Sequence, residues 1–323
     1  MKIPSTIRLL FDRFPLKTYE NEAEPLSFVS EAYYFGRKSK AECVNEQITL
    51  GVHNVRWITL GSGKLFCMPT DPSGLIAALA LCRKHNLSLP GQTTSDGSAY
   101  RLMPMSYMAS SNNELPMLLI SNGESSAYLN DDLRVELLDP NSNIAFTSLE
   151  TVLSEFLDSL GDLWMMLAMG PNLRTTPEGF GDLFHNDPRF EKYTLTQKIL
   201  DSKRSTDMRS WSSFAARHPN LLTNSSQIID IAHPMMFGEH QIEEAFYETC
   251  KHKFDELEKS IPMLLSFLSI GNNSDARDIL EIKFVSFVIS LNHVLNNRTR
   301  TLLTRGENFN EALVYSERFL NEF

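Results

Sequence analysis

Cysteine is scarce in this chain, and the four cysteines do not follow the spacing of a metal site or of a disulfide framework. Cys43, Cys67, Cys82 and Cys250 are far apart, with neither a CxxC pair nor a Cys/His ligand pattern among them. Cys67 and Cys82 lie in apolar stretches, which favours reduced and buried thiols. We therefore expect no metal ligands and no disulfide framework.

The chain also lacks a long uninterrupted apolar run and a surplus of basic residues. Its longest apolar segments, 261–270 and 284–295, are broken by polar residues and are too short to cross a bilayer. The formal net charge is −10 at pH 7, whereas a nucleic-acid-binding face needs a basic surplus. Asp12 and Glu20 in the first twenty residues argue against a cleavable targeting segment. We expect a protein that is soluble or peripherally attached to a membrane, with no nucleic acid partner.

The best-formed local unit lies at 48–90. A β-rich run, 48–68, is followed by Asp71, a favourable helix N-cap, and by Pro72, which suits the first helical position. Apolar residues then recur at helical spacing as one stripe, and the helix is expected to stop at Asn86. The order is strand, turn, helix, which is the first half of a βαβ unit.

Turn signals organise the segment that follows. Gly61 to Gly63 is a hairpin-type turn, and strand-like residues recur at 100–109 with a break at Pro104. Asn122-Gly123 between two apolar runs predicts a second hairpin, because these residues readily adopt positive φ angles. Pro116 opens that hairpin, and the sequence leaves its isomer, cis or trans, undetermined.

From 148 onward the hydrophobic pattern is helical. Thr147 and Glu150 stand where a capping box would begin the first helix. The predicted helices cover 148–169, 193–204, 207–217, 239–260, 275–303 and 308–322. The predicted fold class is α+β, with the arrangement of a glutathione transferase. We expect an N-terminal arm and loop at 1–47, a thioredoxin-like domain at 48–147 and an all-helical domain at 148–323.

The N-terminal segment has an amphipathic pattern. Ile7, Leu10, Phe11 and Phe14 fall on one helical face, with basic residues around them, before Pro15 interrupts the pattern. One interpretation is an arm that docks on a partner or on a membrane surface. The alternative, a terminal segment packed on its own domain, is favoured by the pattern alone.

Five short motifs in the first 90 residues recur in a known order and spacing. They are IRLLFDRFPLKTY at 7–19, LGVHNV at 50–55, TDP at 70–72, LALCRK at 79–84 and LSLP at 87–90. Together they resemble the fungal metaxin-like subunit of the mitochondrial sorting and assembly machinery (SAM complex subunit thirty-five). Beyond residue 90 the resemblance extends only to the helical character.

The resemblance implies a glutathione transferase-like fold without enzyme activity and without a cofactor. It implies a peripheral protein on the cytosolic face of the mitochondrial outer membrane, bound to the β-barrel subunit and to a second metaxin-like subunit. It also implies that the chain helps to receive and insert β-barrel precursors. On physical grounds and on this match, the candidate partner-binding residues are Phe11, Phe14, Leu16 and Tyr19.

The alternative function is that of a glutathione transferase-like enzyme, which needs a hydroxyl or thiol at the strand-to-helix junction. Asp71 would repel a thiolate there, Ser73 lies inside the first helical turn, and Cys67 is expected in the core. Pro116 suits glutathione binding but follows equally from the fold. The sequence therefore favours a binding protein with no catalytic residues.

Three further groups of residues, histidines, methionines and arginines, have both a functional and a purely structural interpretation. His233, His240 and His252 lack metal-ligand spacing and are expected to be solvated or capping residues. Met103, Met105, Met108, Met165, Met166 and Met169 are expected to fill the core rather than line an adaptable surface. Basic residues at the end of the 275–303 helix either face lipid head groups or an acidic partner, or complement the helix dipole; they are Arg298, Arg300 and Arg305.

Overall fold

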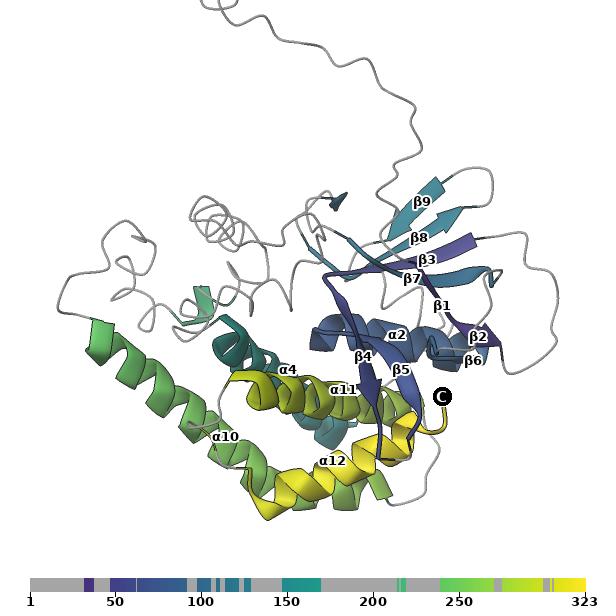
Figure 1. The fold of residues 1–323 in the computed structure, drawn as a ribbon. Coiled ribbons are helices and arrows are strands. Elements are labelled where there is room, and N and C mark those ends of the chain that lie inside the picture. Colours follow the sequence, from purple (N-terminus) through teal and green to yellow (C-terminus); the bar gives the residue numbers. More distant parts are fainter. Residues whose placement is uncertain are drawn as a thin grey trace, which may run out of the picture. The chain divides into compact units, whose positions relative to one another are not determined.

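The strands of this protein come first along the chain and the long helices follow, as a computed structural model shows (Figure 1). The structure describes residues 32–37, 47–61, 63–91, 98–105, 109–110, 114–121, 125–128, 147–169, 214, 216–218, 239–269, 275–298, 303 and 305–323. The α+β fold class, with an N-terminal sheet region and a C-terminal helical region, is therefore confirmed.

The main sheet has five strands in the order β1-β7-β3-β8-β9. Its central strand β3 pairs in parallel with β7 and antiparallel with β8, and both outer pairs are antiparallel. Ile48 to Val52 are all buried, as expected for a strand covered on both faces. The strands are β1 (Tyr33–Tyr34), β3 (Gln47–Val52), β7 (Tyr100–Pro104), β8 (Met117–Ser121) and β9 (Ser125–Tyr128). The β8–β9 pair confirms the hairpin predicted around Asn122-Gly123.

Two short antiparallel pairs lie outside the main sheet. One joins β2 (Gly36–Arg37) to β6 (Leu87–Ser88). The other is a hairpin of β4 (Val55–Thr59) and β5 (Leu65–Pro69). The β-rich run 48–68 is thus not continuous, because the chain turns at His53 and Asn54 and leaves the main sheet. The predicted turn at 61–63 closes this hairpin, where Leu60 N donates to Lys64 O at 2.9 Å.

Helix α2 (Pro72–His85) begins and ends where the sequence predicts. Asp71 is its N-cap and accepts a hydrogen bond from Gly74 N, and Pro72 occupies the first position. Asn86 ends the helix in the left-handed conformation, with φ 50° and ψ 50°.

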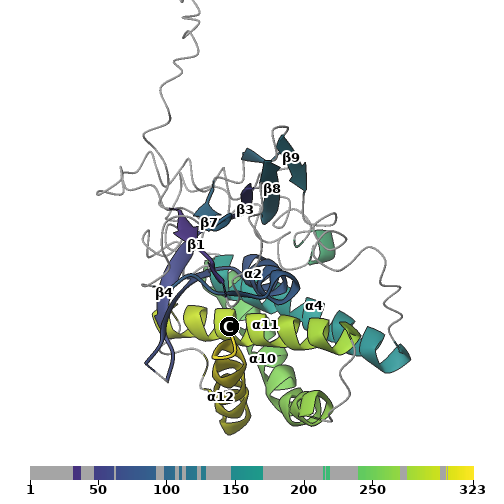
Figure 2. The same ribbon diagram turned by 90° about the vertical axis from the view of Figure 1, so that its right-hand side faces the viewer.

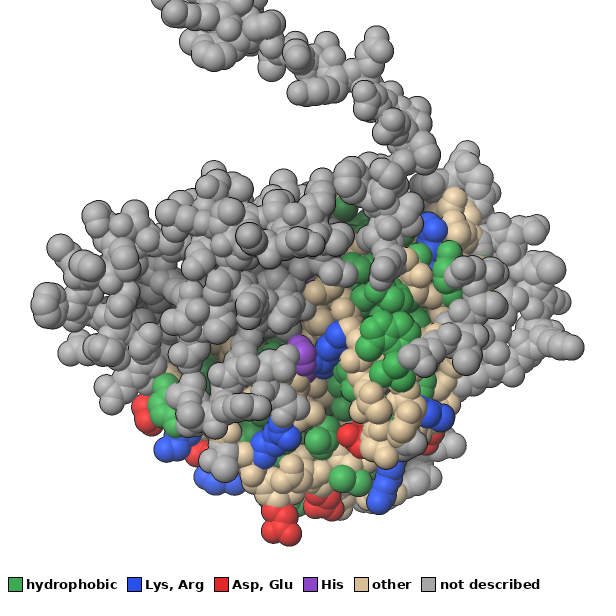
Figure 3. Space-filling view, viewed as in Figure 1, with side chains coloured by type: hydrophobic (Ala, Val, Ile, Leu, Met, Phe, Trp, Pro, Cys, Tyr) green, Lys and Arg blue, Asp and Glu red, His purple; other side chains and the backbone are tan. Residues whose placement is uncertain are grey.

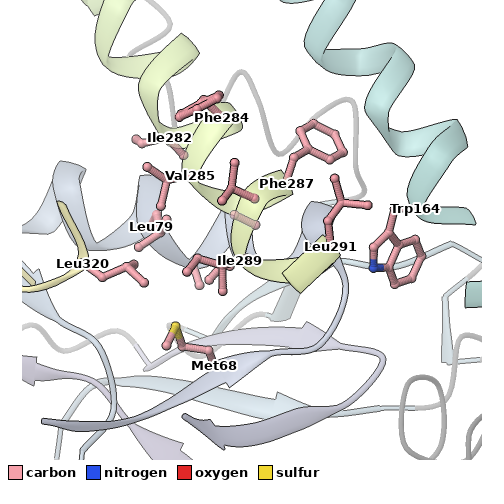
Figure 4. Close-up of a cluster of buried hydrophobic side chains, with 14 of the residues drawn as sticks. Met68, Leu79, Trp164, Ile282, Phe284, Val285, Phe287, Ile289, Leu291 and Leu320 are labelled. Atoms are coloured by element: carbon pink, nitrogen blue, oxygen red, sulfur yellow. The ribbon is translucent and has the colours of Figure 1, made fainter. Parts of the chain in front are cut away.

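The prediction that α2 buries a single apolar stripe is wrong, because a second layer of structure covers the helix. Nine of its fourteen residues are buried, and they lie on all sides of the helix. Figures 1 and 2 both show α2 between the main sheet and helix α11 (Asp275–Arg298), which buries the side of α2 that the sheet leaves uncovered. Figure 4 shows the resulting core, where Leu79 of α2 meets Ile282, Val285 and Ile289 of α11. Both layers therefore share one hydrophobic core.

The remaining long helices are α4 (Ser148–Met169), α10 (Glu239–Ser269) and α12 (Glu307–Leu320). The capping box of α4 is present, since Thr147 N donates to Glu150 Oε2 at 2.8 Å and Glu150 N to Thr147 Oγ1 at 3.3 Å. The predicted end of α10 at Ser260 is wrong: the helix continues through Pro262, because Ile261, Leu264 and Leu268 extend its buried face. The predicted helix 193–204 and most of 207–217 lie outside the described residues.

Candidate functional site

The junction between β3 and α2 is the first candidate site, because several polar side chains are buried there. His53 and Asn54 follow β3, and Thr70 and Asp71 precede α2; each is at most 6% exposed. Asn54 O accepts hydrogen bonds from Thr70 N at 3.1 Å and Thr70 Oγ1 at 3.3 Å, and Asn54 Oδ1 accepts one from Val55 N at 2.8 Å. The two bonds between Asn54 and Thr70 fix the chain after β3 to the residues that precede α2.

Asp71 is the charged centre of this junction. Its Oδ2 accepts a hydrogen bond from Gly74 N at 2.6 Å, and a Cβ on Gly74 would lie 2.8 Å from Asp71 Oδ1. Glycine at position 74 therefore leaves the room that the capping carboxylate needs. Burial raises the pKa of Asp71, and nearby His53 and the Gly74 hydrogen bond oppose that shift.

His53 is the second titratable group in the junction. Burial lowers the pKa of His53, whereas the neighbouring carboxylates of Asp71 and Glu114 raise it by a smaller amount. Glu114 directly precedes the Leu115–Pro116 peptide bond, which is cis. The sequence prediction that left the isomer of Pro116 undetermined is resolved in this way.

A glutathione transferase needs a hydroxyl or thiol at this junction, and the two candidates are Ser73 and Cys67. Cys67 is fully buried, which confirms its predicted place in the core. Ser73 is exposed at the second position of α2, but no hydrogen bond joins it to His53 or Asp71 among the described contacts. A hydroxyl without an adjacent base is a weak nucleophile, and the carboxylate of Asp71 is shielded from solvent. The local geometry suits a structural joint better than a reaction centre.

A second candidate site lies on the β4–β5 hairpin, and the sequence reasoning missed it. Trp57 is 44% exposed, and its ring meets that of Tyr33 edge to face with centroids 5.9 Å apart. Next to it, Arg56 is largely buried. Figure 3 shows apolar side chains gathered over the region of β1, β4 and β7. The burial of residues 55–59 alternates, as in a strand with one face open to solvent, but their sequence VRWIT does not alternate between apolar and polar residues and gave no signal of this site.

The hairpin also reaches the C-terminal helix. At its tip, Gly61 N donates to Glu317 Oε2 at 3.2 Å, and Lys64 Nζ donates to Asn321 O at 3.0 Å. Separately, Arg83 of α2 forms an ion pair with Asp278 of α11 at 2.8 Å. The hairpin therefore has a fixed position against the helices.

The predicted partner-binding residues Phe11, Phe14, Leu16 and Tyr19 lie outside the described residues, so that prediction stays untested. Met165 and Met166 are buried, in agreement with core methionines. His252 is exposed on α10, 3.6 Å from Glu256. Arg305 is partly buried. His233, Met108 and Arg300 lie outside the described residues, as do the side chains of His240, Met169 and Arg298.

The described part of the chain contains no group of three or more His, Cys, Asp or Glu side chains arranged to hold a metal ion. Within the same residues, no helix combines the length and apolar character needed to cross a membrane.

Comparison with known proteins adds two findings. Residues 1–120 match the model of the SAM35 family, described as SAM35, subunit of SAM complex. The "Sorting assembly machinery 35 kDa subunit" of Saccharomyces cerevisiae is 23% identical over 314 residues, which are 90% of this chain and 89% of that protein. The family match over residues 1–120 and the similarity along most of the chain agree, and they confirm the resemblance to the SAM35 family predicted from 7–19 and 50–90.

Proposed function

We propose that this chain is a non-enzymatic receptor and scaffold subunit of the mitochondrial sorting and assembly machinery. Two findings support this proposal most strongly. One is the family match, and the other is a relative that is similar along nearly the whole chain and is named as a subunit of that machinery. In this proposal the chain lies peripherally on the cytosolic face of the outer membrane. It binds the β-barrel subunit and a second metaxin-like subunit, and it helps to recognise and insert β-barrel precursors.

The fold we propose is that of a glutathione transferase, with domain boundaries at 47/48 and 147/148. The strand order β7-β3-β8-β9 supports it, with a parallel β3–β7 pair connected by α2 and an antiparallel hairpin after Pro116. A parallel pair needs a crossover connection of this kind, and α2 supplies it. The long helices that follow fit the second domain of such a protein.

The absence of enzyme activity is part of the proposal. It is supported by the burial of Asp71 and Cys67 at the junction where a transferase holds its thiolate-stabilising group. A glutathione-conjugation assay on the purified full chain tests this point directly. Turnover well above that of a heat-denatured sample would favour the transferase alternative.

We propose the N-terminal segment as the contact with the machinery, through Phe11, Phe14, Leu16 and Tyr19. Its apolar face with basic neighbours suits the docking of an amphipathic helix into a partner groove. The test compares the double variant Phe11→Ser/Phe14→Ser with the native chain in co-purification of the β-barrel subunit from mitochondria. Aromatic anchors dominate such contacts, so recovery should fall about tenfold or more.

The matched control places two apolar-to-serine substitutions on an exposed part of α4. Leu149 and Val152 are 54% and 60% exposed there, and Leu149→Ser/Val152→Ser should leave recovery unchanged. Equal loss in both double variants would mean that general destabilisation is responsible. Full recovery with Phe11→Ser/Phe14→Ser would reject the N-terminal contact while leaving membership of the complex intact.

A further inference from the structure

Arg56 is a largely buried cation with no anionic partner among the described residues. Its side chain is mostly buried, and its Nε is shielded from solvent and makes no hydrogen bond with the described residues. Burial alone lowers the pKa of Arg56 to about 9, and no carboxylate offsets it. Arginine is normally buried together with an anion, because removing its hydration without compensation is costly. Within the described part of the chain, the charge of Arg56 is therefore not balanced by an anion.

The neighbouring residue supplies an apolar contact on the opposite face of the same strand. Successive side chains of a strand point to opposite faces, so Arg56 and Trp57 lie on either side of β4. Arg56 stands opposite Met68 in β5, and Trp57 opposite Cys67. The Trp57 ring remains 44% exposed although it also contacts Tyr33. A ligand that touches both residues must lie along the edge of β4.

The backbone of β4 is arranged for such a ligand. Thr70 N donates to Asn54 O, and Leu60 N donates to Lys64 O. In an antiparallel pair the hydrogen-bonded positions alternate, so residues 56 and 58 bond to β5 and residues 57 and 59 direct their N–H and C=O groups away from it. Among the described strands β4 pairs only with β5, which leaves the backbone groups of Trp57 and Thr59 at an open edge.

We propose that the edge of β4 binds an extended segment of a protein partner that carries an acidic side chain next to an apolar one. The backbone of the segment pairs with Trp57 and Thr59. Its carboxylate lies against the guanidinium of Arg56, and the adjacent apolar side chain, on the opposite face, packs on Trp57. The alternation of the two side chains matches the period of a strand.

A carboxylate on a protein fits this site better than a lipid phosphate. The chain has a net charge of −10, whereas peripheral attachment to anionic lipids needs clusters of basic residues. The planar guanidinium also presents paired N–H donors that match the two oxygens of a carboxylate. The proposal rests on the proposed function for the identity of the partner, which is a subunit or precursor handled by the machinery.

The test uses the full chain with a photo-crosslinking amino acid at position 57, expressed in mitochondria and carried into the assembled machinery. Val314 on α12, 50% exposed, is the matched control position. We expect a crosslink from position 57 to a protein partner, at a peptide containing Asp or Glu. Adding Arg56→Met should reduce its yield at least about tenfold, because an interfacial charge pair is lost. Arg56→Lys should restore only part of the yield.

A second measurement separates binding from folding. Since Arg56 is buried without an anion, Arg56→Met should raise the melting temperature of the isolated chain by about 2 °C while it weakens the contact. A lower melting temperature would mean that Arg56 has a structural role and would overturn the proposal. Co-migration with the machinery but no crosslink from position 57, or a crosslink to lipid, would overturn it and spare the proposed function. A chain that fails to co-migrate at all would overturn both.

Discussion

Lys283 links α11 to α4 and provides a quantitative test of how the two helices are held together. The side chain is 5% exposed, and Nζ donates to Ser154 Oγ at 2.8 Å and to Asp158 Oδ1 and Oδ2 at 2.8 and 3.0 Å. Asp158→Ala removes the carboxylate and leaves the ammonium buried. Breaking a buried pair costs about 3–5 kcal/mol. Because the Asp158 side chain is 48% exposed and therefore screened, we expect a smaller loss, about 2 kcal/mol.

Substitution of the other partner, Lys283, should change the free energy of unfolding much less. Lys283→Met removes the charge and retains an unbranched apolar side chain between the helices. Replacing a buried charged partner by a well-packed apolar residue is often neutral, so we expect a change within about 1 kcal/mol of the native value. In the Lys283→Met background, Asp158→Ala should cost less than about 0.5 kcal/mol, because the charge that needed Asp158 is gone.

The assay is urea unfolding of the four proteins in this double-mutant cycle. With a slope of about 3 kcal/mol per molar urea, Asp158→Ala should lower the midpoint by about 0.7 M. Glu155→Ala, an exposed substitution on the same helix, is the matched control and should move the midpoint by less than about 0.2 M. A Lys283→Met protein that is destabilised as much as Asp158→Ala would refute the reasoning.

Three further predictions concern helix ends and the polar junction. Thr147→Ala removes the two hydrogen bonds between Thr147 Oγ1 and Glu150 and should cost about 1 kcal/mol in unfolding free energy, measured with urea. Gly74→Ala should destabilise by about 1–3 kcal/mol in the same assay, because its Cβ would lie 2.8 Å from Asp71 Oδ1. His53 has a lowered pKa in the folded state, so the unfolded state takes up its proton first and stability should fall as pH drops below about 6.5. His53→Gln should flatten that slope by at most about 1.4 kcal/mol per pH unit in thermal or urea titrations.

Each of these three predictions would be contradicted by a specific result. A Thr147→Ala loss no larger than that of the exposed control Val152→Ala would argue against the capping box. Gly74→Ala with native stability would mean that the capping carboxylate can move without cost. Identical pH slopes for the native chain and His53→Gln would show that another group controls acid stability.

The helix ends were predictable because their signals are local. Asp71 and Pro72 at the start of α2 and Asn86 at its end act through bonds within a few residues, and the structure places the helix between them. The same holds for Thr147 and Glu150 at the start of α4. The β8–β9 hairpin was predictable because Asn122 and Gly123 readily adopt positive φ angles.

Features that depend on distant segments were not predictable in this way. The apolar residues of α2 predicted one buried stripe, but α11, about two hundred residues further along the chain, covers another side. The hydrophobic pattern predicted an end of α10 at residue 260, yet burial of Ile261 and Leu264 extends that helix through Pro262. The exposure of Trp57 and the lack of an anion beside Arg56 among the described residues depend on β4 leaving the main sheet, which no local sequence signal indicates.

The central claim is that this chain takes part in the assembly of β-barrel proteins. Its most direct test is import of a labelled β-barrel precursor into mitochondria depleted of this chain, with assembly of the mature barrel followed over time on native gels. We predict slower assembly, restored when the native chain is supplied. Assembly at the normal rate in mitochondria without the chain would contradict the account.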